Sequence, residues 1–310
     1  MRPTIRRSRN LPFLQEFITK NGFWQISLLF FENLEYDEIM RIVDVHTHLS
    51  RLRDSKYSES HKKNLRYVLA EAKQNKIGRL LIISGLANAD GTKTSVKSLI
   101  KLVGNNSKIS IIGSFDLAQN SKKELTELAG LLKKRKIVGI KLYTGYQHFY
   151  PNDKRCVPIY KLCEKYKVPV IFHSGDTLMG YIKNPKLKYS HPLHIDEVAT
   201  DWPNLKIVIA HMGNPWLLDC AEILYKNPNV YADISGLVVG KDLDTPYGRL
   251  MKKRLLELID YSDENKLMYG TDWPLCPMKT YLKFVKSLGL SKQQREKLMY
   301  KNAEEVFGLK

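Results

Sequence analysis

The stretch Ile42-Val43-Asp44-Val45-His46-Thr47-His48 is the first of a series of short apolar runs along the chain. Each run is rich in Val, Ile or Leu, as expected of a parallel strand that is buried on both faces. Longer, lysine-rich amphipathic segments lie between the runs and have the pattern of helices. The expected strands are Ile42–His48, Arg79–Ser84, Ile109–Phe115, Ile137–Tyr143, Val168–His173, Ile207–His211, Val230–Ile234 and Leu267–Asp272.

Eight strand-and-helix repeats between residues 41 and 310 match an α/β fold of the (β/α)8 TIM-barrel type in number and length. No linker rich in Pro, Gly or Ser divides this part of the chain, so we expect it to form one domain. The fifth strand is followed by a long insertion, Gly175–Pro203, which would lie over the mouth of the barrel. The helical pattern is clearest in Lys62–Lys73, Lys122–Lys134, Ile159–Tyr166, Trp216–Tyr225 and the closing segment Lys292–Phe307.

Residues 1–40 do not fit the repeat and are expected to be an N-terminal extension without an assigned role. They combine several arginines with a patchy apolar stretch, Phe23–Phe31, which is too short and broken to span a membrane. No small-residue cleavage site follows that stretch, which weakens the alternative of a targeting peptide. A natural start at Met40 is the third alternative, because Met40 leads straight into the first strand.

The composition is that of a folded protein, with 43% hydrophobic and 26% charged residues, but the net charge of +18 is unusual. Lysine-rich helix faces exposed to solvent explain such a charge, and attraction of an anionic substrate is the alternative. No nucleic-acid-binding motif occurs, so we expect a small-molecule substrate and no nucleic acid. Four cysteines without a CxxC pair indicate reduced thiols in a cytoplasmic protein. No run of about 18 apolar residues occurs, so we expect no membrane partner. A homo-oligomer remains open.

Polar residues fall where the expected strands end. Side chains alternate along a strand, so Asp44, His46 and His48 are expected to share one face, with both imidazoles able to reach one metal ion. Other apolar strands end in His173, His211 and Asp272. Because barrel enzymes keep their sites at the C-terminal ends of their strands, these residues predict a metal centre there. Histidine and carboxylate ligands together suit zinc, with manganese or iron as alternatives.

The chain resembles the amidohydrolase superfamily, and within it the amidohydrolase-related group of hydrolases and nonoxidative decarboxylases. The resemblance covers residues 41–309 and is specific to the superfamily but not to a substrate. The motifs that carry it are Asp44-Val45-His46-Thr47-His48, His173, Ala210-His211-Met212-Gly213-Asn214-Pro215-Trp216, Tyr231-Ala232-Asp233-Ile234-Ser235-Gly236, Gly270-Thr271-Asp272-Trp273-Pro274 and Asn302-Ala303-Glu304-Glu305-Val306-Phe307-Gly308.

The resemblance implies that His46, His48 and Asp272 bind a divalent metal, with His173 as a further ligand. His211 would be a ligand in a two-metal enzyme or an acid/base in a one-metal enzyme. Lys141 stands where two-metal members carry a bridging carbamate, but an unmodified lysine that contacts the substrate fits the sequence equally.

The implied activity is hydrolysis of an ester, amide or lactone-like bond by a metal-activated water, with Asp272 and His211 as catalytic residues. A metal-dependent nonoxidative decarboxylase is the first alternative, and a non-catalytic binding barrel is the second. The candidate substrate contacts are His191 and His194 in the long insertion and Asp233 at the end of the seventh strand.

Overall fold

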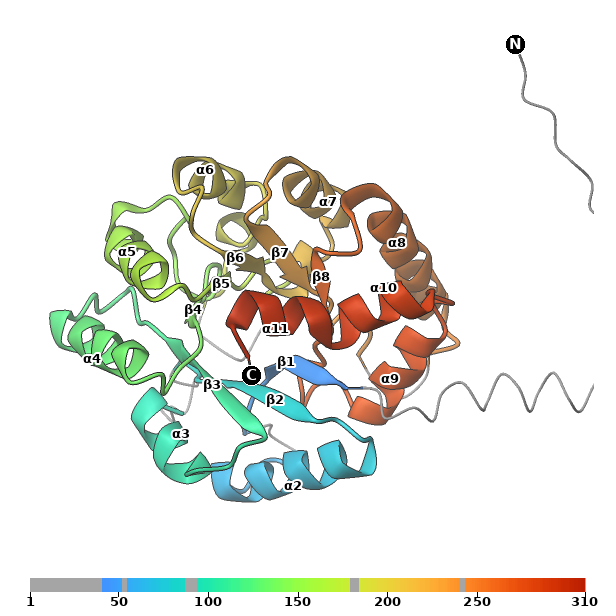
Figure 1. The fold of residues 1–310 in the computed structure, drawn as a ribbon, viewed down its shortest axis with the longest axis horizontal. Coiled ribbons are helices and arrows are strands. Elements are labelled where there is room, and N and C mark those ends of the chain that lie inside the picture. The colour runs from blue at the N-terminus through green and yellow to red at the C-terminus, as the bar shows by residue number, and fades with distance from the viewer. Residues whose placement is uncertain (1–40, 52–54, 87–93, 179–183, 240–242, 310) are drawn as a thin grey trace, which may run out of the picture. The chain divides into compact units, whose positions relative to one another are not determined.

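The computed structural model describes residues 41–51, 55–86, 94–178, 184–239 and 243–309, so the expectation for residues 1–40 lies outside the described residues. Eight parallel strands follow one another around a nearly closed barrel in the order in which they occur in the sequence (Figure 1). This architecture confirms the predicted TIM barrel. The strands are β1 (Val43–Thr47), β2 (Arg79–Ile83), β3 (Ile109–Ser114), β4 (Ile140–Leu142), β5 (Val170–Phe172), β6 (Ile207–Ile209), β7 (Val230–Asp233) and β8 (Leu267–Met268).

Helices surround the strands in Figure 1, as a parallel sheet buried on both faces requires. They are α2 (His61–Gln74), α3 (Val96–Val103), α4 (Lys122–Lys133), α5 (Val157–Tyr166), α6 (His194–Asp201), α7 (Leu217–Lys226), α8 (Pro246–Ser262) and α9 (Met278–Lys286). Near the C-terminus, α10 (Lys292–Glu296), a π-helical turn (Lys297–Lys301) and α11 (Asn302–Phe307) run on without a break. This continuous segment confirms the predicted closing helix.

The segment between β5 and β6 differs from the prediction of one long insertion. Its second half is the helix α6, which connects β5 to β6 as in the other repeats. The eight-residue helix α6 has no side-chain N-cap, so the sequence carries no clear start signal for it. Only the part before α6 forms the loop that follows β5.

The barrel closes between β1 and the residues that follow β8. Val45 N donates a hydrogen bond to Tyr269 O at 3.0 Å, and His48 N donates to Trp273 O at 2.8 Å. Between them, Asp272 N donates to His46 O, also at 2.8 Å. The closure therefore joins the backbones of two predicted metal ligands directly.

A β-bulge in β1 decides which way its histidines point. Asp44 pairs with Leu80 and Thr47 with Ile82, so Val45 and His46 together lie against a single β2 residue. A bulge of this kind turns two successive side chains toward the same side of the sheet. Val45 belongs to a buried cluster with residues of five other strands and of α11, and His46 also points into the barrel.

Asp44 lies on the other side of β1, and the prediction that it shares a face with His46 is wrong. Its carboxylate accepts hydrogen bonds from Thr271 N at 3.0 Å and from Thr271 Oγ1 at 2.6 Å. The simple alternation of side chains does not hold because the bulge interrupts it. Asp44 therefore links β1 to the residues after β8 and does not line the mouth.

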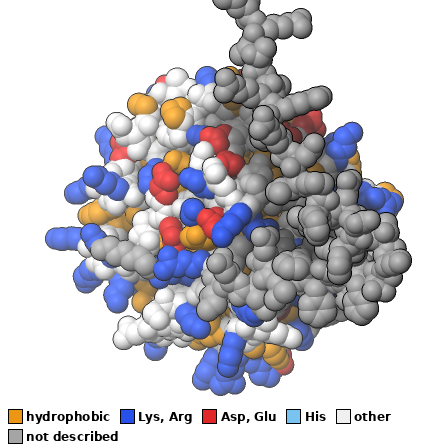
Figure 2. Space-filling view, turned by 45° about the vertical axis from the view of Figure 1, so that its right-hand side comes forward, with side chains coloured by type: hydrophobic (Ala, Val, Ile, Leu, Met, Phe, Trp, Pro, Cys, Tyr) orange, Lys and Arg blue, Asp and Glu red, His pale blue; other side chains and the backbone are white. Residues whose placement is uncertain are grey.

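Lys and Arg side chains are exposed on the surface of the barrel (Figure 2). On the face visible in Figure 2, Lys and Arg side chains are spread widely and do not gather into one patch. None of the described helices combines the length and apolarity needed to cross a membrane.

Replacing Thr271 by Val tests the link between β1 and β8. The substitution removes the hydroxyl that donates to buried Asp44 and accepts from Trp273 N. We expect the free energy of unfolding to fall by about 1–3 kcal/mol, because a buried carboxylate oxygen loses its partner. Urea denaturation followed by circular dichroism measures the change.

Thr126→Val is the matched control, because Thr126 lies on the exposed face of α4 and, among the described residues, its hydroxyl bonds only to Lys122 O. The control should change the stability by less than about 0.5 kcal/mol. Equal losses in the two variants would show that the Asp44–Thr271 contact does not stabilise the barrel.

Candidate metal centre

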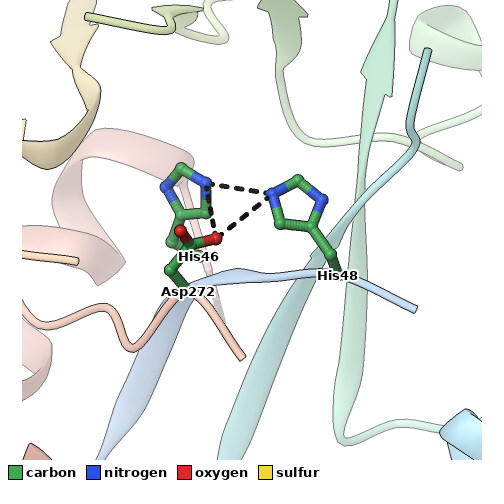
Figure 3. Close-up of side chains that lie close together, drawn as sticks. All are labelled: His46, His48 and Asp272. Atoms are coloured by element: carbon green, nitrogen blue, oxygen red, sulfur yellow. Dashed lines mark hydrogen bonds and ion pairs between the residues drawn. The ribbon is translucent and has the colours of Figure 1, made fainter. Parts of the chain in front are cut away.

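Three side chains meet at the C-terminal mouth of the barrel (Figure 3). His46 Nε2 lies 3.2 Å from His48 Nε2, and Asp272 Oδ1 lies 3.8 Å from the first nitrogen and 3.6 Å from the second. His46 and Asp272 are buried and His48 is half-buried. Two histidines from the end of β1 and one carboxylate from the segment after β8 therefore point at one another across the barrel seam.

This arrangement fits a divalent metal ion. Metal–ligand bonds of about 2.0–2.1 Å in a tetrahedral site place neighbouring ligand atoms about 3.3 Å apart. The three separations observed lie within about half an ångström of that value. The donor set of two imidazoles and one carboxylate is also one that zinc accepts. His46, His48 and Asp272 thus form a candidate site for a divalent metal.

Asp233, at the end of β7, fixes the orientation of His46. His46 Nδ1 lies 2.9 Å from Asp233 Oδ2, and both side chains are buried. Burial opposes the charge of Asp233, but the charge of His46 and the hydrogen bond from it hold the pKa of Asp233 well below its usual range. An ionised carboxylate only accepts hydrogen bonds, so His46 donates from Nδ1, and Nε2 is the ring nitrogen that a metal would bind.

The same carboxylate also fixes His211. The hydroxyl of Ser235 donates to Asp233 Oδ1, and its oxygen lies 2.9 Å from His211 Nδ1. Since the hydroxyl proton is already committed, His211 Nδ1 must be the donor in this second hydrogen bond. His211 Nε2 is therefore left with a lone pair in the neutral imidazole.

The backbone is unusual at two of these positions. His211 has a φ of 59° and Asp272 a φ of 63°, in the left-handed region that non-glycine residues rarely occupy. Such conformations cost about 1–3 kcal/mol each and cluster at functional sites. Gly236 leaves room beside both side chains, since a Cβ at this position would lie 3.1 Å from His211 Nδ1 and 3.4 Å from Asp272 Oδ2.

Two histidines of the site, His48 and His211, are neutral near pH 7. Burial, together with the charge of neighbouring His46, lowers the pKa of His48 to about 3 and that of His211 to about 4. For Asp272, burial is outweighed by the charges of His211, His46 and His48, which lower its pKa. Neutral imidazoles and an ionised carboxylate are the forms that bind metal ions.

A cavity of about 250 Å³ opens over this cluster. His46, His48, His211 and Asp272 line it together with Lys141 and His173. Its remaining walls combine rings and aliphatic side chains with a few polar groups, namely Ser50, Tyr143, Tyr146, Asp176, Leu178, Asn214, Gly236, Val239, Tyr247, Pro274 and Leu275. The cavity has room for a small molecule in contact with the candidate metal ligands.

The other predicted site residues divide into two groups. His173 lines the cavity, but its Nε2 lies 3.0 Å from Asp176 O, and it belongs to neither described group of converging ligand atoms. Its role as a metal ligand stays a prediction. His191 and His194 lie outside the cavity lining and contact each other, with ring centroids 6.3 Å apart. Asp233 is buried behind His46 and does not line the cavity.

Several cavity residues were not singled out from the sequence. Tyr143 and Tyr146 lie at and just beyond the end of β4, so the rule that strand ends carry the site could have found them. Tyr247 lies in the first turn of α8, and its hydroxyl accepts a hydrogen bond from Asn214 Nδ2 at 3.2 Å. No sequence pattern marks a tyrosine in that position as part of a site.

Fold and site together define a TIM barrel with a candidate metal centre at its C-terminal mouth. A model of the amidohydrolase family matches residues 43–309, and the chain belongs to this family. No curated protein matches the sequence.

Solved structures share the fold at low sequence identity. A 5-carboxyvanillate decarboxylase from Sphingomonas paucimobilis is 13% identical with a TM-score of 0.65. A zinc-bound amidohydrolase from Burkholderia multivorans is 17% identical, also with a TM-score of 0.65. A probable 2-pyrone-4,6-dicarboxylic acid hydrolase from Acinetobacter baumannii, with citric acid bound, is 16% identical with a TM-score of 0.63. Each alignment covers 87% of this chain and 100% of the other chain.

Replacing Asp233 by Asn tests whether this carboxylate orients the candidate metal ligand His46. The amide lacks the charge that stabilises the Nδ1–H form of His46 and can donate a hydrogen bond to Nδ1 instead. We expect zinc affinity to fall about 10- to 100-fold, as is usual when a partner of a ligating histidine is lost. Competition with a chromophoric chelator measures the affinity.

Asp219→Asn removes the same charge from an exposed position on α7 and should leave the zinc affinity unchanged. If Asp233→Asn binds zinc as tightly as the wild type while retaining its fold, Asp233 does not orient the ligands.

Proposed function

We propose that this protein is a metal-dependent hydrolase that acts on an ester, amide or lactone-like bond of a small molecule. The observation that carries the proposal is the convergence of His46 Nε2, His48 Nε2 and Asp272 Oδ1 on the floor of a small cavity. An ion held there would provide Lewis acidity and a water molecule whose pKa is near 7. Zinc fits the donor set best, with manganese or iron as alternatives.

Asp272 and His211 have different roles in the proposed hydrolysis. Asp272, ionised and beside the candidate ion, accepts a proton as the water oxygen bonds to the acyl carbon. The bond from that carbon to the leaving group then breaks, and Asp272 returns the proton to the leaving oxygen or nitrogen. Neutral His211 presents Nε2 as an acceptor that orients the water or the substrate, because its Nδ1–H is committed to Ser235.

Decarboxylation is the alternative reaction for the same site. The aliphatic and aromatic walls of the cavity, which include Leu178 and Val239, favour loss of charge from a bound carboxylate. The bond to the carboxyl carbon would break, carbon dioxide would leave, and Asp272 or His211 would carry the proton to the remaining carbon. The similar fold of a 5-carboxyvanillate decarboxylase is compatible with this reaction, and a non-catalytic barrel is the further alternative.

The cellular setting belongs to the same proposal. All four cysteines are free and buried, and burial raises the pKa of each thiol. Unreactive, unpaired thiols are compatible with a reducing compartment. We therefore propose that the protein acts in the cytoplasm on a small-molecule substrate.

Assays of the zinc-loaded protein on esters, lactones and cyclic amides, beside aromatic carboxylates, test the reaction. We expect hydrolysis of at least one class, loss of activity with a strong chelator and recovery with zinc. Asp272→Asn should lower kcat/KM by at least about 100-fold, since it removes both a metal ligand and the proton acceptor.

Asp219→Asn serves again as the charge control and should keep full activity. Release of carbon dioxide without any hydrolytic product would favour the decarboxylase. If the protein binds some of these compounds but converts none of them, the non-catalytic barrel would be favoured.

A further inference from the structure

Lys141 is a cationic cavity residue that takes no part in the candidate metal centre. It lies in the middle of β4 and its side chain is fully buried. Within the described part of the chain, its Nζ has no hydrogen-bond partner. A buried ammonium without a hydrogen-bond partner costs several kcal/mol, so such a group favours a ligand that supplies negative charge.

The position of Lys141 relative to the metal centre follows from the strand order. In an eight-stranded barrel with sequential order, β4 lies opposite β8, and Asp272 follows β8. Lys141 and Asp272 therefore reach into the cavity from opposite walls. A molecule that contacts the candidate metal with one end can meet Lys141 with the other.

The protein's own carboxylates near Lys141 are already engaged. Asp233 accepts hydrogen bonds from His46, from His211 N and from Ser235. Asp272 faces His46 and His48. Burial lowers the pKa of Lys141 to about 8, although the charges of these two acids raise it. Neither acid forms a hydrogen bond with the amine.

The wall around Lys141 is suited to a flat apolar body. The Tyr143 ring centroid lies 5.7 Å from Nζ, and Tyr146 packs against His173 with ring centroids 4.6 Å apart. Leu178 and Leu275 add aliphatic surface to the same cavity. A volume of about 250 Å³ suits a molecule built on a single ring.

We propose that Lys141 is an unmodified lysine that binds a carboxylate group of the substrate, so that the substrate is a small cyclic acid carrying this carboxylate opposite the reacting bond. This inference rests on the proposed function of the site and adds its substrate class. A bridging carbamate on Lys141 is the competing assignment, because it too would satisfy the buried amine.

Binding of simple probes tests the role of Lys141 without requiring turnover. Benzoate and its neutral analogue benzamide are titrated calorimetrically into zinc-loaded full-length protein. The wild type should prefer benzoate, and Lys141→Met should weaken benzoate binding about 10- to 100-fold while leaving benzamide unchanged. Lys97→Met, an exposed lysine on α3, is the matched control and should behave as the wild type.

A second variant and a second measurement distinguish loss of carboxylate binding from loss of the fold. Lys141→Gln keeps a hydrogen-bond donor without the charge and should show an intermediate loss of benzoate affinity. In the absence of probe, Lys141→Met should unfold at a higher temperature than the wild type, because it removes an unpaired buried charge. Both variants should retain the metal content of the wild type.

Two results would overturn the assignment. An unchanged preference for benzoate in both Lys141 variants would show that this residue does not bind the carboxylate. Metal loading that depends on bicarbonate in the wild type, and that falls in both variants, would identify Lys141 as a bridging carbamate. If no substrate is hydrolysed, the proposed reaction fails, but the comparison of benzoate with benzamide still decides the role of Lys141.

Discussion

The hydrogen bond from Asp272 N to His46 O is the contact on which the site depends. It belongs to the seam where the first and last strands of the barrel meet, which are also the two parts of the chain that carry the candidate metal ligands. Closing the barrel therefore assembles the site. The bulge in β1 sets the direction of the His46 side chain, because it turns His46 into the barrel beside Val45.

Polar contacts behind the ligands make the arrangement specific. Asp233 holds the Nδ1–H form of His46 directly and that of His211 through Ser235. On the other side of β1, Asp44 holds Thr271, the residue before Asp272. Two buried carboxylates that line no part of the cavity thus position groups that do. Such contacts explain how the strained backbone at His211 and Asp272 is maintained.

The sequence predicted the barrel and the position of the site because both follow from simple periodic rules. Runs of buried β-branched residues gave the strands, and the polar residues that end them marked the mouth. The rule of alternation failed at Asp44, since a bulge cannot be read from the residue types around it. His191 and His194 were expected at the cavity because their loop follows β5, yet the structure places them in contact with each other outside its lining. Tyr247 was not predicted because its place depends on how α8 approaches the barrel, which is a property of the tertiary structure.

The metal content of the purified protein tests the central claim most directly. Elemental analysis compares the wild type with a His46→Ala/His48→Ala double variant and with a His61→Ala/His148→Ala double variant that changes two histidines away from the cluster. The structure predicts about one or two equivalents of a divalent metal in the wild type and in the second variant, and none in the first. A wild-type protein that binds no metal even after reconstitution with excess zinc, manganese or iron would contradict the account.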